Sequence, residues 1–172
     1  MKIAYAFRRS TFYQYNGDPR ALPEAPARGR FLRRVKGIGF DGIELGIDTL
    51  GGADAVESGV TDLRKELEDN GVPCVAVRVG GGFHDPRVAV ENRLALEKAA
   101  EVADWVGAGI VNTTVGTPPR FPNAPGVTSG EPTSQGASRT AAEDDFLRTA
   151  RVLHEVGERA GAKGIAITVE VH

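Results

Sequence analysis

The chain has little cysteine, almost no net charge and no long hydrophobic run. Cys74 is the only cysteine among 172 residues, so no disulfide can form within the chain, which suits a reducing compartment. The 21 lysine and arginine residues nearly balance the 23 aspartate and glutamate residues, and this balance argues against a basic surface for nucleic acid. The apolar stretch before Arg8 is too short for a signal peptide or a membrane span. We therefore expect a cytoplasmic protein that binds neither nucleic acid nor a membrane.

Short apolar runs rich in β-branched residues alternate with longer segments of helical period. The runs cover residues 2–7, 41–47, 73–79, 109–115 and 164–171. This alternation predicts βα units that form a parallel sheet, and therefore an α/β fold. The chain length and the apolar fraction of 41% fit a single domain over residues 1–172.

Two of the helical segments carry start signals. Asp85 is placed to cap the third helix and Pro86 suits its first position. Thr140 and Glu143 have capping-box spacing at the start of the fourth. The apolar side of that fourth helix is expected to consist of Phe146, Ala150, Leu153 and Gly157.

The segment 116–139 is rich in proline and has no apolar period. Its composition is typical of an extended surface insertion. It also follows the C-terminal end of a predicted strand, where parallel α/β folds bind ligands, so a lid over a binding site is the alternative.

The last predicted strand has two different faces. Ile165, Ile167, Val169 and Val171 alternate with Ala166, Thr168, Glu170 and His172. The branched face suits packing against helices, whereas the second face suits the inside of a closed barrel near its mouth. A carboxylate there needs a cation or hydrogen bonds, unless Glu170 is simply solvated at a frayed end.

Four other residues are candidates for the same site. His84 follows the third strand and could contact substrate or transfer a proton, although a lone loop histidine is often structural. Glu44 and Arg78 alternate with apolar neighbours, so both are expected to point inward, where Arg78 could pair with Glu44 or contact an anion. Arg8 follows the first strand and could approach the pocket or remain solvated.

The strand-end segments together resemble a known superfamily. The segments "MKIAYAF", "IGFDGIELG", "NRLALEKAAEVADWVGAGIVNTTVG" and "GIAITVEVH" are similar to those of the sugar phosphate isomerase/epimerase superfamily, which has the xylose isomerase-like TIM barrel. A TIM barrel has about 250 residues and eight βα units. The resemblance therefore implies the N-terminal portion of such a barrel, truncated after the fifth strand.

The resemblance also implies a divalent metal, one of Mn, Mg, Co or Zn, held at the ends of the later strands. Glu170 matches the first metal ligand of the superfamily, and the other ligands would lie beyond residue 172. Glu170 and His84 are then the catalytic candidates. The candidates for contact with the sugar substrate are Glu44, Arg78, His172 and Arg8.

Three functions are compatible with this resemblance. The first is a metal-dependent sugar isomerase or epimerase that abstracts a proton next to a carbonyl. The second is the larger subunit of a C-glycoside deglycosidase, a 3-oxo-glucoside lyase, which "YAFRRSTFYQYNGDPRALP" and the proline-rich segment resemble. The third is a non-catalytic half-barrel that binds sugar or a partner chain. Since a half-barrel exposes sheet edges, a homo-oligomer or a complementary subunit is expected.

Overall fold

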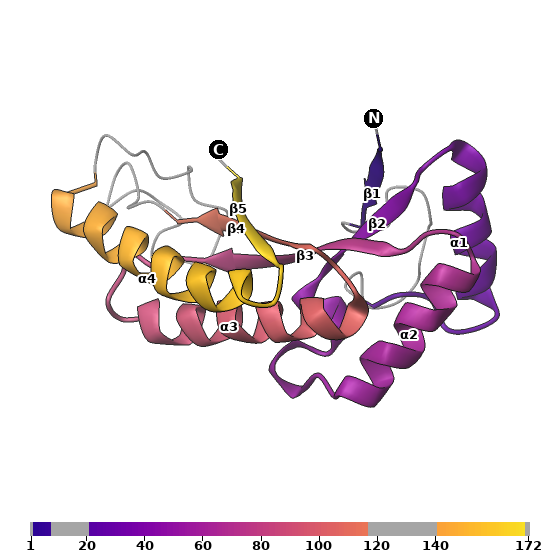
Figure 1. The fold of residues 1–172 in the computed structure, drawn as a ribbon, viewed down its shortest axis with the longest axis horizontal. Coiled ribbons are helices and arrows are strands. Elements are labelled where there is room, and N and C mark those ends of the chain that lie inside the picture. The colour runs from indigo at the N-terminus through magenta and orange to yellow at the C-terminus, as the bar shows by residue number, and fades with distance from the viewer. Residues whose placement is uncertain (1, 8–20, 117–140, 171–172) are drawn as a thin grey trace, which may run out of the picture.

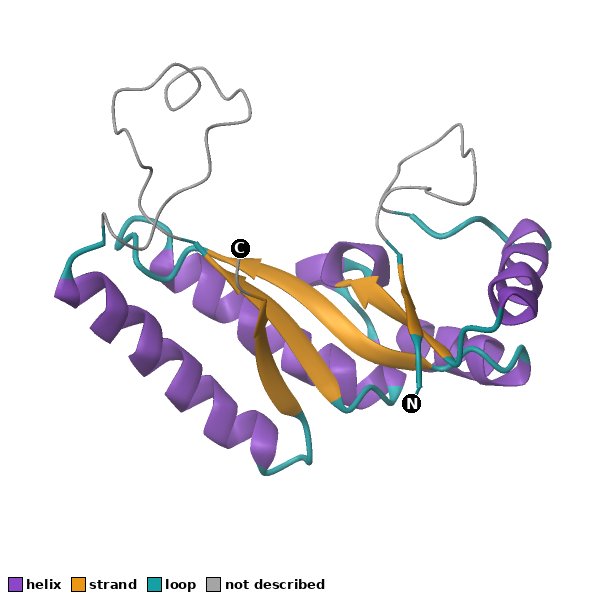
Figure 2. Ribbon diagram, turned by 90° about the horizontal axis from the view of Figure 1, so that it is seen from above, coloured by secondary structure: helices purple, strands orange, loops and turns teal. Residues whose placement is uncertain are grey.

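The computed structural model describes residues 2–7, 21–116 and 141–170. They form one parallel sheet with helices on one side, and no described helix covers the other side, called the open face below (Figure 1, Figure 2). The strands are β1 (Ala4–Ala6), β2 (Gly42–Gly46), β3 (Cys74–Gly81), β4 (Ile110–Val115) and β5 (Ala166–Glu170). They lie side by side in the order β1-β2-β3-β4-β5 and are all parallel. The predicted five-stranded parallel α/β fold is confirmed.

Each crossover between neighbouring strands carries helical structure. The helices are α1 (Ala27–Ile38), the 3₁₀ turns η1 (Ile47–Leu50) and η2 (Gly52–Asp54), α2 (Glu57–Asp69), α3 (Ala89–Val106) and α4 (Glu143–Gly161). Gly39 and Gly107 end α1 and α3 with φ values of 108° and 77°, a left-handed conformation that glycine adopts without steric cost. No helix in the described ranges is long and apolar enough to cross a membrane.

The start of α3 differs from the prediction. The helix begins at Ala89, because Asp85 forms a separate turn in which its carboxylate accepts the Arg87 backbone N–H at 3.0 Å. The Val88 N–H then bonds the Asp85 carbonyl at 3.1 Å. Asp85 and Pro86 therefore shape the loop before the helix, since the aspartate side chain satisfies a turn and not the helix end.

The apolar face predicted for α4 is also wrong in part. The residues that α4 buries are Val152, Val156 and Ala160, whereas Phe146 is 53% exposed. The reason is tertiary packing: α4 contacts both α3 and β5, and these neighbours cover a different part of its circumference. The helix begins at Glu143, close to the predicted start. Thr140, the predicted cap, lies outside the described residues.

A β-bulge in β3 decides which residues face the helices. Ile43 pairs with Cys74, but the next residue, Glu44, pairs with Ala76, so Val75 is an extra residue. Gly42 accommodates the bulge, because a Cβ on it would lie 2.6 Å from Val75 Cγ1. The extra residue changes the alternation so that Cys74 and Val77, three positions apart, are both buried.

The core lies between the sheet and the helix layer. Phe31 of α1 is fully buried and meets the rings of Tyr5 and Phe7 edge-on, at centroid distances of 5.9 and 5.7 Å. Such aromatic pairs contribute about 0.5 to 1.5 kcal/mol each beyond their buried area. They hold the short β1 against α1 although β1 has only three residues in the sheet.

We predict that stability declines above pH 9 through Cys74. Burial raises the pKa of the Cys74 thiol from 9.0 to about 12. Between these values the folded thiol keeps its proton while the unfolded thiol loses it, so the free energy of unfolding falls by about 1.4 kcal/mol per pH unit. Urea unfolding of the wild-type chain and Cys74→Ala from pH 8 to pH 11 measures the difference. Equal pH slopes for both proteins would contradict this assignment.

Candidate functional site

Polar side chains gather on the open face of the sheet. The strand pairing places Gly46, Arg78, Asn112 and Thr168 opposite one another across β2, β3, β4 and β5. These residues alternate with the buried residues that face the helices, so the side chains of Arg78, Asn112 and Thr168 lie on the open face. In a parallel sheet the carboxyl ends of the strands share one edge; Gly46 lies at that edge as the last residue of β2, and the row then crosses the middle of β3, β4 and β5.

Glu44 connects this row. Its carboxylate lies 3.5 Å from Arg78 Nε, and the side chains of Glu44 and Arg78 are 14% and 33% exposed. The Asn112 amide nitrogen lies 3.5 Å from the other carboxylate oxygen of Glu44. Thr168 then donates its hydroxyl to the Asn112 side-chain oxygen at 3.1 Å. Of the two contacts expected of Arg78, the one with Glu44 is observed, and it belongs to a chain of polar contacts that extends over four strands.

Glu170 lies one layer further toward the same edge. It pairs in register with Thr114 and is partly buried. A hollow of about 680 Å³ on the open face is lined by residues of all five strands and the segments before them, Glu170 included. Its polar lining consists of Lys2, Asp41, Glu44, Asn112, Thr168 and Glu170. Carboxylate, amide and hydroxyl groups on an otherwise apolar wall suit a small polyhydroxylated ligand.

His84 lies outside this hollow. Its imidazole packs beside Gly116 at the end of β4, where a Cβ on the glycine would approach His84 Cε1 to 3.1 Å. The residue lines a second pocket, of about 290 Å³, with Phe146 and Leu153 of α4 and with Val169. The structure therefore places His84 at the carboxyl end of the sheet, but on the side of α4.

The predicted site residues thus fall into three groups. Glu44, Arg78 and Glu170 lie on the open face, and His84 lies against α4. Arg8 and His172 lie outside the described residues, as does nearly all of the proline-rich segment. Sequence reasoning did not single out Asn112, although its alternation with Val111 and Thr113 in an apolar run is the same signal that identified Glu44.

The described residues do not form a metal site of their own. No group of three or more histidine, cysteine, aspartate or glutamate side chains that could hold a metal ion occurs within residues 2–7, 21–116 and 141–170. Divalent metals in proteins take four or more ligands, supplied in part by water. Glu170, the ligand implied by the resemblance, would need further ligands from outside this part of the chain.

The chain matches the model of a known protein family over most of its length. The family model "Xylose isomerase-like TIM barrel" matches residues 32–172, so the chain belongs to this family. No curated protein matches the chain by sequence.

Solved structures of the same fold are similar to the chain over nearly all its length. A 3-keto-D-glucoside 4-epimerase from E. coli has 18% identity and a TM-score of 0.65, over 98% of this chain and 55% of that one. A D-psicose 3-epimerase, solved in the presence of D-fructose, has 15% identity and a TM-score of 0.65, over 99% and 52%. A xylose isomerase-like TIM barrel protein from Mycobacterium smegmatis, in complex with magnesium, has 22% identity and a TM-score of 0.62, over 99% and 55%. The chain therefore spans about half the length of these structures.

We predict that the Glu44–Arg78 ion pair stabilises the open face. Arg78→Met would remove a cation from beside a largely buried carboxylate and lower the free energy of unfolding by about 1 to 3 kcal/mol. Adding Glu44→Gln should restore part of this loss. As a matched control, Lys65→Met breaks the pair with Asp69, whose side chains are 76% and 62% exposed, and should change stability by less than about 0.5 kcal/mol. Equal losses at both sites in urea unfolding would contradict the prediction.

Proposed function

We propose that this chain supplies the sugar-binding first half of an isomerase or epimerase barrel, which acts on a keto sugar by abstracting a proton next to the carbonyl. The observation that carries the proposal is the polar lining of the open face, where Glu44, Asn112, Thr168 and Glu170 surround one hollow. Membership of the xylose isomerase-like family supports it. Similarity to a D-psicose 3-epimerase and to a 3-keto-D-glucoside 4-epimerase also supports it.

The residues of the open face divide into two roles in this proposal. Arg78 and Asn112 already engage the Glu44 carboxylate, which keeps the face rigid, while Glu44 and Asn112 line the hollow and orient sugar hydroxyls. Thr168 is exposed and has an oxygen that can accept a further hydrogen bond from the sugar. Glu170, nearest the carboxyl edge, is the group proposed to contact the reacting end of the sugar.

In this proposal Glu170 is the one described residue that would bind a metal ion. The resemblance implies Mn, Mg, Co or Zn, and a relative in the same fold was solved with magnesium. The described residues form no cluster of three or more metal-binding side chains, so the ligands that would join Glu170 would come from outside the described residues. His84 stays a candidate for proton transfer at the same end of the sheet.

A second candidate has one observation in its favour. A 3-oxo-glucoside lyase also begins with proton abstraction next to a carbonyl, and one of the similar structures is a 3-keto-D-glucoside 4-epimerase. A sugar-binding chain without turnover is the remaining alternative. The lyase and the non-catalytic chain would use the same hollow as the isomerase or epimerase. The experiment must therefore separate sugar binding from exchange of the sugar proton.

We predict exchange of the proton next to the carbonyl of a ketose. The chain is incubated in D₂O with D-fructose or D-psicose and with each of Mn²⁺, Mg²⁺, Co²⁺ and Zn²⁺, and ¹H NMR follows the loss of that proton. Glu170→Gln should lower the exchange rate by about 100-fold or more, as expected for a group at the reacting atoms. Glu91→Gln is the matched control, because Glu91 is exposed on α3.

The outcomes separate the candidates. Exchange that depends on Glu170 supports the isomerase or epimerase proposal, and release of a glycone from a 3-oxo-glucoside would favour the lyase. Ketose binding without exchange would favour the non-catalytic alternative. Full exchange in Glu170→Gln would show that Glu170 has no part in the chemistry.

A further inference from the structure

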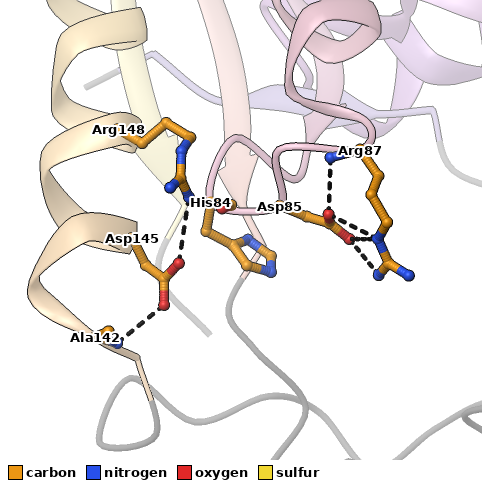
Figure 3. Close-up of polar contacts among 6 residues, drawn as sticks. All are labelled: His84, Asp85, Arg87, Ala142, Asp145 and Arg148. Atoms are coloured by element: carbon orange, nitrogen blue, oxygen red, sulfur yellow. Dashed lines mark hydrogen bonds and ion pairs between the residues drawn. The ribbon is translucent and has the colours of Figure 1, made fainter.

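Arg148 of α4 reaches across to the loop between β3 and α3. Its guanidinium donates a hydrogen bond to the His84 backbone carbonyl (Figure 3). The Asp145 carboxylate lies 3.4 Å from the same nitrogen, and its second oxygen accepts the Ala142 N–H at 2.9 Å. The Asp145 carboxylate therefore caps the first turn of α4 and also orients the guanidinium that contacts the loop.

The other side of the loop is fixed independently. The Asp85 carboxylate bonds the Arg87 guanidinium at 2.6 Å and the Arg87 backbone N–H at 3.0 Å. These bonds lower the pKa of Asp85 to about 2, so the carboxylate is ionised at neutral pH and committed to Arg87. Figure 3 shows Asp85 turned toward Arg87 and away from α4, while the His84 ring lies between the two contacts.

The imidazole has little freedom in this position. Its Nδ1 is buried and meets no hydrogen-bond partner in the described part of the chain. Its Cε1 lies close to Gly116, and the Gly116 N–H bonds the Gly81 carbonyl at 2.6 Å, which joins the ends of β3 and β4. Among the described residues, Arg148 is the only one whose side chain donates a hydrogen bond to the His84 backbone.

We propose that Arg148 is the positioning residue for His84. Its hydrogen bond to the His84 carbonyl, oriented by Asp145, fixes the turn so that the imidazole lies at the carboxyl ends of β3 and β4. The planar guanidinium can face the carbonyl and the carboxylate together, whereas a lysine ammonium is a point donor on a more flexible stem. The inference rests on the proposed function in one respect, because the position of the His84 ring affects catalysis only if His84 takes part in that function.

NMR of the histidine rings tests this inference without any ligand. The chain has three histidines, so a ¹³C–¹H spectrum of the labelled protein contains three Cε1 signals, and the His84→Gln and His154→Gln variants assign two of them. In Arg148→Gln the His84 signal should shift or broaden, and the His154 signal, from an exposed ring on α4, should stay unchanged. Arg148→Lys should give an intermediate spectrum.

Two further variants keep the test decisive. Arg151→Gln removes an exposed arginine of the same helix and should leave the His84 signal as in the wild type. Asp145→Asn keeps an oxygen for the Ala142 N–H but loses the charge that orients Arg148, so it should shift the His84 signal in the same direction by a smaller amount. If Arg148→Gln fails to fold, Arg148→Lys and Asp145→Asn decide the question. An unchanged His84 signal in folded variants would overturn the inference.

The failure of this inference and the failure of the proposed function can be told apart. If the wild-type chain exchanges no ketose proton, the proposed function fails, while the ring signals still decide whether Arg148 positions His84. If exchange occurs, Arg148→Gln should lower the rate at saturating ketose by about 10-fold and change the half-saturating concentration by less than about 2-fold. An unchanged rate at saturation would contradict a functional role for the contact.

Discussion

The bulge at Val75 is the constraint on which the open face depends. Without the extra residue, the alternation that buries Cys74 would also bury Ala76 and Arg78 against the helices. With it, Arg78 lies on the side of Glu44, and a carboxylate that is only 14% exposed has its cation on the neighbouring strand. Asn112 and Thr168 continue this polar contact to β5. One inserted residue therefore creates both the stability of this face and its chemistry.

The two sides of the sheet carry different potential sites. The open face presents carboxylates, an amide and a hydroxyl around one hollow, which suits a ligand rich in hydroxyl groups. On the helix side, His84 borders an apolar pocket with Phe146 and Leu153, and Arg148 joins the start of α4 to its loop. The His84 pocket lies at the carboxyl ends of β3 and β4, whereas the hollow extends along the open face from the segments before the strands to Glu170 at the carboxyl end of β5. In the described residues they remain separate.

Much of this arrangement could be predicted from the sequence. The five apolar runs gave the strands, and alternation around Glu44 and Arg78 predicted their contact. The bulge could not be predicted, because residues 74–77 are all apolar and an extra residue among them leaves no mark in the polar–apolar alternation. The predicted start of α3 was wrong, because Asp85 and Pro86 are suited to a turn as well as to the start of a helix. The side on which His84 lies depends on the Arg148 contact, which joins residues 64 positions apart.

Chemical-shift mapping with a ketose tests the central claim most directly. Titration of D-fructose into the ¹⁵N-labelled chain should move the amide signals of Glu44, Asn112, Thr168 and Glu170, which line the hollow of the open face. The amide signals of the groove between α3 and α4, around Glu97 and Arg159, should stay in place. Shifts confined to that groove, or no shifts at ketose concentrations that saturate related enzymes, would contradict a sugar site on the open face.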